Sequence, residues 1–304
     1  MTKDPERAGR DTEGDTRPTV GFVGVGNIGF PMARNLATAG FALTVFDVSP
    51  EPLERLAAEG ARVAASLREV AQLSEIVGVC VRDDAQVEEV LFGRDGLVGA
   101  ARPDTIVAVH STIRPRTVVR LAERAAASGV HVLDVPITGA ARGAEARTLC
   151  YMAGGDAALI ERCRPVFETS GARIVHTGAL GSGMATKLCN NVMMYLGFLA
   201  AFEATVLAEG AGLSEEALKS VTEANGVMTR PMMYYLDLRK RVLAGAGGDA
   251  LREQLEKITD LAEKDLAIAI EFGRELGLSL PGAAMCEQLM ATVYGLKERR
   301  RARD

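Results

Sequence analysis

The chain has 304 residues, 48% of them hydrophobic, a formal net charge of −5 and a pI near 5.5. This length and composition predict a globular protein of one large or two ordinary domains. Basic and acidic residues are mixed along the chain, which excludes the basic stripe that neutralises phosphate backbones, so nucleic acid is not an expected partner. No apolar run reaches the roughly 18 residues needed to cross a bilayer, so no membrane partner is expected.

Residues 1–18 are charged where a secretory signal would be apolar, and they predict a disordered tail. The cysteines are odd in number, scattered and never form a CxxC pair, which is typical of reduced thiols in a cytoplasmic protein. The histidines show no ligand spacing, so no metal site is expected.

Short β-branched runs then alternate with amphipathic stretches from Thr19 to about Thr177. This alternation is typical of βαβ units and predicts a parallel sheet. The predicted strands lie at residues 19–24, 43–47, 76–81, 105–109, 130–135, 150–154 and 173–176.

The first predicted strand runs directly into the motif G-x-G-x-x-G, formed by Gly24, Gly26 and Gly29, which opens a helix reaching about Ala39. The first glycine allows a tight turn, the second lets a pyrophosphate approach the backbone, and the third lets helix and strand pack closely. Free amides at the helix start attract the anion, so we expect Asn27 and Ile28 in the turn to contact a dinucleotide as well. A glycine-rich structural turn is the alternative reading.

Asp47 ends the second predicted strand, 23 residues after Gly24. A carboxylate there accepts hydrogen bonds from the adenosine ribose and repels a 2′-phosphate. The sequence therefore favours NAD as the cofactor, while NADP stays possible because a neighbouring arginine could change the preference.

The alternation of predicted strands and helices ends near residue 180, and the composition of the chain changes there. From Ser182 to about Gly210 one almost uncharged pattern predicts a long helix, and the remainder reads as helical. We therefore expect an α/β fold with an N-terminal Rossmann-type dinucleotide-binding domain over residues 19–180 and an all-α C-terminal domain over residues 181–304, joined by the long helix. A helix with so few charges should be buried on most of its faces, which one small domain cannot achieve alone. We therefore expect a second subunit to pack against it in a homodimer or homotetramer.

Four later segments bear on the chemistry: "HSTIRP" from His110, "DVPITGAARGA" from Asp134, "GSGMATKLCNN" from Gly181 and "EKDLAIA" from Glu263. With the glycine motif, in this order and spacing, they make the chain resemble the β-hydroxyacid dehydrogenases, the family of 3-hydroxyisobutyrate, tartronate semialdehyde and 6-phosphogluconate dehydrogenases. The resemblance covers nearly the whole chain after the tail.

The resemblance implies that Lys187 is the catalytic lysine and that Asn191, one helical turn later, contacts the substrate. It also implies that Thr138 and Gly139 hold the substrate carboxylate and hydroxyl. The chain departs from the family at Ala140, which replaces a second glycine, and at Arg147, where a small residue is common.

On the cofactor side, the resemblance places Thr112 near the nicotinamide and implies that Lys264 reaches the cofactor from the helical domain. Val81 and Arg82 match a Leu-Pro pair that lines the nucleotide, so Arg82 is a further departure.

Residue chemistry agrees with the role of Lys187. A lysine in the first turns of a helix lies near the positive end of the macrodipole, and partial burial adds desolvation; both lower its pKa. Such an amine can take a hydroxyl proton while hydride leaves the carbinol carbon. The sequence thus predicts an NAD(P)-dependent dehydrogenase of small 3-hydroxy acids.

Two alternatives stay open at this stage. Imine reductases have a similar fold and cofactor but lack this lysine, and a non-catalytic dinucleotide-binding scaffold would also have lost it. Arg114 and Arg142 lie near the expected substrate entrance, where they would either pair with an acidic substrate or be ordinary surface arginines.

Overall fold

The computed structural model describes residues 17–296, so most of the predicted N-terminal tail lies outside the described residues. Arg17, within that predicted tail, donates a hydrogen bond to the carbonyl of Ala39.

The strand-forming runs assemble into one mixed sheet in the order β3-β2-β1-β4-β5-β6-β8-β7, with β9 paired to β8. All seven predicted strands are present, and two short strands, β3 and β7, were not predicted because two-residue strands leave no periodic pattern. The strands are β1 (Val20–Val23), β2 (Leu43–Phe46), β3 (Arg62–Val63), β4 (Ile76–Val79), β5 (Ile106–Val109), β6 (His131–Asp134), β7 (Ile137–Thr138), β8 (Leu149–Gly154) and β9 (Gly171–Gly178).

The predicted parallel sheet is present, but it is mixed at one edge. Strand β8 runs antiparallel to both β6 and β7, whereas β1 to β6 and the pair β8–β9 are parallel. The segment between β7 and β8 holds only the six-residue helix α6 (Ala140–Glu145), which is too short for a parallel crossover.

Helices cover both faces of the sheet and form two separate apolar cores with it. One core receives α1, α2, α6 and α7, and the other receives α3, α4 and α5. Their bounds are α1 (Gly29–Thr38), α2 (Pro50–Ala58), α3 (Leu67–Leu73), α4 (Asp84–Phe92), α5 (Pro115–Ala126) and α7 (Ala157–Phe167).

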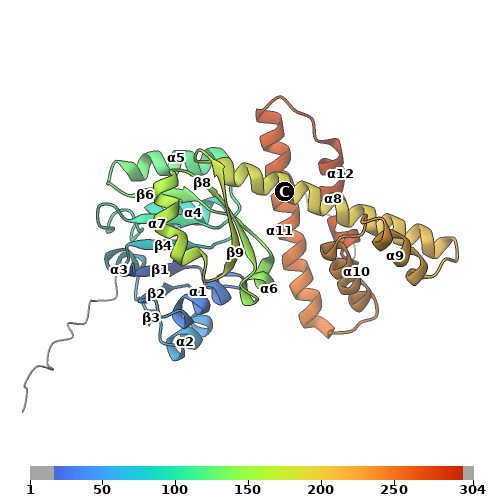
Figure 1. Cartoon of the computed structure of the whole chain (residues 1–304), viewed down its shortest axis with the longest axis horizontal. Coiled ribbons are helices and arrows are strands. Elements are labelled where there is room, and N and C mark those ends of the chain that lie inside the picture. The colour runs from blue at the N-terminus through green and yellow to red at the C-terminus, as the bar shows by residue number, and fades with distance from the viewer. Residues whose placement is uncertain (1–16, 297–304) are drawn as a thin grey trace, which may run out of the picture.

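A single 29-residue helix, α8 (Ser182–Gly210), leads from the sheet domain into the helical half of the chain, as Figure 1 shows. The helices of this half form a third apolar core. The predicted long helix is therefore present. The other helices of this half are α9 (Glu215–Ala224), α10 (Arg230–Leu243), α11 (Gly248–Glu275) and α12 (Pro281–Val293).

By length and composition alone, α8 could cross a membrane, since a window of it has a mean hydropathy of 1.5. The expectation that no segment is long enough to cross a bilayer is therefore wrong for α8, because it counted only uninterrupted apolar residues. Core helices of soluble proteins pass the same test, and α8 packs against β8, α10, α11 and α12. Large apolar side chains on it still face outward, among them Met193 and Leu207, which are 77% and 74% exposed.

Candidate active site

The glycine turn after β1 has the geometry that a dinucleotide needs. Gly24 has a φ of +87°, and a Cβ on Gly29 would lie 1.9 Å from the Gly24 carbonyl oxygen, so both positions require glycine. A Cβ on Gly26, in contrast, would meet nothing within 4 Å. Helix α1 begins after Ile28 without any side-chain cap, so the turn offers open space and uncapped helix amides to an anion.

Asp47 lies beside this turn at the end of β2. Its Oδ2 accepts a hydrogen bond from the amide of Val25 at 2.7 Å, and its Oδ1 accepts one from Ser49 at 2.8 Å. Both bonds fix the carboxylate, so a negative charge is held next to the glycine turn.

The start of α8 is bound tightly to the sheet by Asp134, the last residue of β6. Its buried carboxylate accepts hydrogen bonds from the amides of Gly181 at 2.9 Å and Met184 at 2.8 Å. A Cβ on Gly183 would lie 2.4 Å from the Met152 carbonyl oxygen, so the helix approaches β8 as closely as glycine permits. Burial raises the pKa of Asp134 to about 6, although the backbone amides around it act in the opposite direction.

Lys187 follows this anchored turn on α8. Burial lowers the pKa of Lys187 to about 8; the carboxylate of Asp265 opposes this effect and the positive charge of Lys264 adds to it. Within residues 17–296, no hydrogen bond or ion pair engages the Lys187 amine. The side chain is therefore a basic amine available to a ligand.

Asp265 on α11 is the buried acid of this site, and the sequence analysis missed it. It is only 2% exposed, and its Oδ2 accepts a hydrogen bond from the side-chain amide of Asn191 at 2.7 Å. Its Oδ1 lies 3.0 Å from the amine of Lys264 without hydrogen-bond geometry, and so has no hydrogen-bond donor in the described part of the chain. The one signal in the sequence was an acid beside Lys264 that opens the apolar run "LAIAI".

Asn191 itself is buried, and its side-chain oxygen accepts a hydrogen bond from Asn190 at 3.2 Å. The contact between Asn191 and a substrate stays a prediction, because the structure shows this amide engaged by protein groups.

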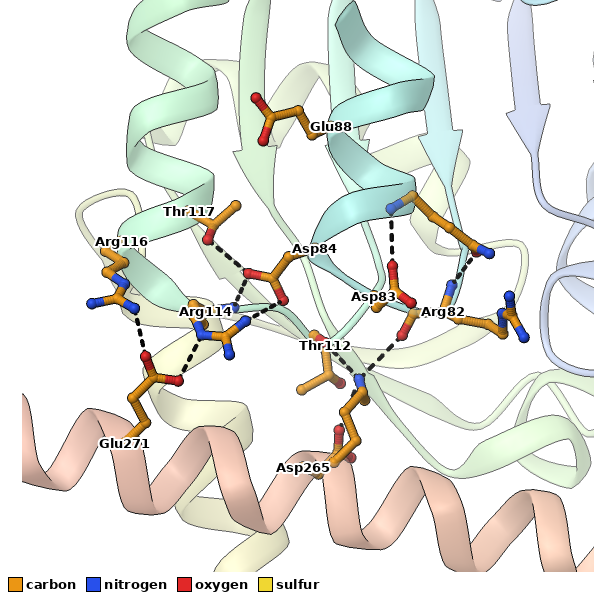
Figure 2. A network of polar contacts seen from close by, with 12 residues as sticks. Arg82, Asp83, Asp84, Glu88, Thr112, Arg114, Arg116, Thr117, Asp265 and Glu271 are labelled. Atoms are coloured by element: carbon orange, nitrogen blue, oxygen red, sulfur yellow. Dashed lines mark hydrogen bonds and ion pairs between the residues drawn. The ribbon is translucent and has the colours of Figure 1, made fainter. Parts of the chain in front are cut away.

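Lys264 bridges the two halves of the molecule. Its amine donates to the carbonyl oxygens of Thr112 at 2.7 Å and Arg82 at 3.2 Å, which lie just beyond the carboxyl ends of β5 and β4 (Figure 2). The predicted cofactor residues Thr112, Arg82 and Lys264 therefore meet. Val81 lies next to Gly24, because a Cβ on that glycine would be 3.1 Å from the Val81 side chain.

A second bridge, formed by ion pairs, crosses the same boundary. Glu271 on α11 pairs with Arg114 at 2.7 Å and with Arg116, and Arg114 also lies 3.3 Å from Asp84 (Figure 2). Arg114 is thus occupied by two protein acids, which argues against its suggested role in pairing with an acidic substrate.

The predicted substrate loop lies at β7 and α6. Thr138 is half-buried and Gly139 is exposed, with φ +123°. Ala140 and Arg147, the two departures from the family pattern, keep φ values of +54° and +57°, so the backbone retains the left-handed conformation that glycine favours. Within residues 17–296, no hydrogen bond or ion pair joins this loop to Lys187.

A glycine turn suited to a dinucleotide, together with a partly buried amine of lowered pKa on α8, defines an oxidoreductase of the dinucleotide-dependent class. Residues 19–178 match the family model described as the NAD binding domain of 6-phosphogluconate dehydrogenase. Residues 181–303 match a second family model, described as NAD-binding of NADP-dependent 3-hydroxyisobutyrate dehydrogenase. The chain belongs to the β-hydroxyacid dehydrogenase family and is an NAD(P)-dependent hydroxyacid dehydrogenase.

Individual relatives match over nearly their whole length. An uncharacterized oxidoreductase of Mycobacterium tuberculosis is 36% identical, covering 92% of this chain and 94% of the relative. The 2-(hydroxymethyl)glutarate dehydrogenase of Eubacterium barkeri is 32% identical, covering 89% and 87%. The structure of Mycobacterium tuberculosis 3-hydroxyisobutyrate dehydrogenase with L-serine superposes with a TM-score of 0.77 at 29% identity, covering 91% and 93%.

Imine reductases share the fold alone: one from Myxococcus stipitatus superposes with a TM-score of 0.63 at 20% identity.

Proposed function

We propose that Lys187 is the general acid and base of a dehydrogenase that oxidises small 3-hydroxy acids, with NAD preferred over NADP. The observation that carries this proposal is the partly buried amine of Lys187, which has no ion-pair or hydrogen-bond partner within residues 17–296 and whose pKa is lowered to about 8. An amine of this pKa is half-deprotonated at about pH 8, and both of its protonation states are populated near physiological pH, so it can both take and return a proton.

In the oxidative direction the neutral amine of Lys187 accepts the proton of the substrate hydroxyl. The nicotinamide, when bound, supplies the hydride acceptor, so the substrate loses one proton and one hydride and becomes the oxo acid. In the reductive direction the Lys187 ammonium donates the proton to the forming hydroxyl. Oxidation therefore rises, and reduction falls, as the pH passes upward through about 8.

The residues present fit a bound dinucleotide. The open space at Gly26 would receive the pyrophosphate, and the fixed carboxylate of Asp47 would bind the ribose hydroxyls and repel a 2′-phosphate. We expect the ratio of kcat/KM with NAD to that with NADP to exceed one, and to fall in Asp47→Asn. An unchanged ratio in Asp47→Asn would remove Asp47 as the source of the preference.

The test of the chemistry is nicotinamide reduction with 3-hydroxyisobutyrate, glycerate and L-serine in the parent and in Lys187→Ala. Loss of the general acid and base should lower kcat at least about 100-fold. Binding of NADH, followed by its fluorescence, should persist in the variant. A variant with kcat within a few-fold of the parent would contradict the role of Lys187.

We also propose a cytoplasmic homo-oligomer in which a second copy covers the outward face of α8. The exposed Met193 and Leu207 and the five free cysteines support this proposal. The mass in solution at micromolar concentration tests it, since a monomer would contradict it.

A further inference from the structure

One exposed arginine of the sheet domain, close to the helical domain, has no acidic partner among residues 17–296. Arg142 lies on α6, four residues after Thr138 and three after Gly139, and is exposed. In the described part of the chain it forms no ion pair, unlike Arg114, which Asp84 and Glu271 occupy. Its charge is therefore available to a ligand.

Arg142 is held towards the helical domain by an aromatic ring. Its guanidinium carbon lies 5.8 Å from the centre of the Tyr234 ring on α10, a cation–π contact between the two domains. Figure 1 shows α6 on the side of the sheet domain that faces α11. The contact therefore places Arg142 at the boundary between the two domains.

Tyr234 is itself fixed by its neighbour. Tyr235 is buried, donates a hydrogen bond to the Val293 carbonyl at 2.6 Å and stacks on Phe198 at 4.8 Å. Tyr234, one residue earlier on the helix, consequently points outward and is 53% exposed. Arg230, four residues before it, lies on the same face of α10 and likewise forms no ion pair among the described residues.

We propose that Arg142 recognises a second carboxylate, so that the preferred substrate is a 3-hydroxy acid with an additional acidic group at its far end. One carboxylate would bind at Thr138 and Gly139, and the other would extend along the exposed face of α6 to the guanidinium beside Tyr234. This proposal rests on the proposed function of the site. A relative that matches along most of the chain is named for such a diacid, 2-(hydroxymethyl)glutarate.

The test compares kcat/KM for 2-(hydroxymethyl)glutarate and for 3-hydroxyisobutyrate in the parent, Arg142→Gln and Arg142→Lys. We expect the parent to favour the diacid, and the ratio of the two kcat/KM values to fall roughly tenfold or more in Arg142→Gln, since a charge-assisted pair is lost. Arg142→Lys should restore part of the ratio, because it keeps the charge.

Arg147→Gln is the matched control, as it removes an exposed arginine near the end of the same helix with the same change in net charge. Its ratio should stay close to that of the parent. A ratio unchanged in Arg142→Gln, or lowered equally in Arg147→Gln, would overturn the inference. Failure of the parent to oxidise any hydroxy acid would instead contradict the proposed function.

Discussion

The side-chain nitrogen of Asn191 on α8 lies 2.7 Å from Oδ2 of Asp265 on α11, and both side chains are almost fully buried. This bond places a carboxylate near Lys187, where its charge raises the pKa of the amine against the effect of burial. Burial has the larger effect on the pKa of the proposed base, and a carboxylate on another helix adjusts it.

Replacing Asp265 by Asn should move the pH profile of hydroxy acid oxidation to lower pH. The isosteric amide removes the charge that raises the pKa of Lys187, so the neutral amine forms at lower pH. The measurement is kcat/KM between pH 6 and 10. Glu271→Gln is the control, because Glu271 lies on the same helix but pairs with Arg114 and Arg116 instead. A profile that stayed in place or moved to higher pH would contradict this account.

Replacing Ala140 by Gly should stabilise the protein by about 0.5–1 kcal/mol. Alanine is strained at the positive φ of this position, and relief of that strain should outweigh the larger conformational entropy that glycine gives to the unfolded chain. The same sign is expected for Arg147→Gly. Urea unfolding measures both. Ala141→Gly is the control: Ala141 lies inside α6 without positive φ, so glycine should destabilise there. A loss of stability in Ala140→Gly would show that its methyl group makes a compensating contact.

His110 should make the protein less stable as the pH falls from about 6.5 to 4. Its Nδ1 lies 2.8 Å from the Val135 carbonyl, and burial lowers its pKa to about 4. The unfolded state then binds the proton more readily, so stability is fully present above about pH 6.5 and is lost below it. The effect is on the order of 2–3 kcal/mol.

His110→Asn, which keeps a donor for Val135, should flatten this dependence relative to the parent. Because the raised pKa of Asp134 acts in the opposite direction between about pH 6 and 4, the difference between variant and parent is the quantity to compare. Equal slopes in the parent and His110→Asn would contradict the role of His110.

Glu271→Gln should cost roughly 1 kcal/mol or less, since its pairs with Arg114 and Arg116 are partly exposed. The loss should shrink in 1 M NaCl, where surface charges are screened. Unfolding at low and high salt measures it. A loss of the same size at both salt concentrations would mean that packing, not charge, holds α11 at this boundary.

Many elements of the fold can be predicted from the residues of each segment alone. The β-branched runs, the glycine turn and the long apolar helix each carry their own pattern, so strands such as β1 and helix α8 could be predicted without tertiary information. The direction of β8 could not, because it depends on how short α6 is and on which edge of the sheet is free.

The site was predictable where chemistry follows from one residue and its helix position, as with Lys187. Asp265 was not, because its importance comes from the packing of α11 on α8, and 74 residues separate it from Asn191. Asp134 was missed for a similar reason: its sequence neighbours give no sign that it binds amides about fifty residues later.

The first turn of α8 is attached closely to the sheet, so the position and the basicity of Lys187 depend on two different parts of the protein. Its position derives from β6 and β8 through Asp134 and Gly183, whereas its basicity is adjusted from α11 through Asp265. Substitutions of Asp265 on α11 can therefore change the pKa of Lys187 without moving the turn that positions its amine. The place of this amine and its basicity therefore depend on different parts of the chain, and one can change while the other stays the same.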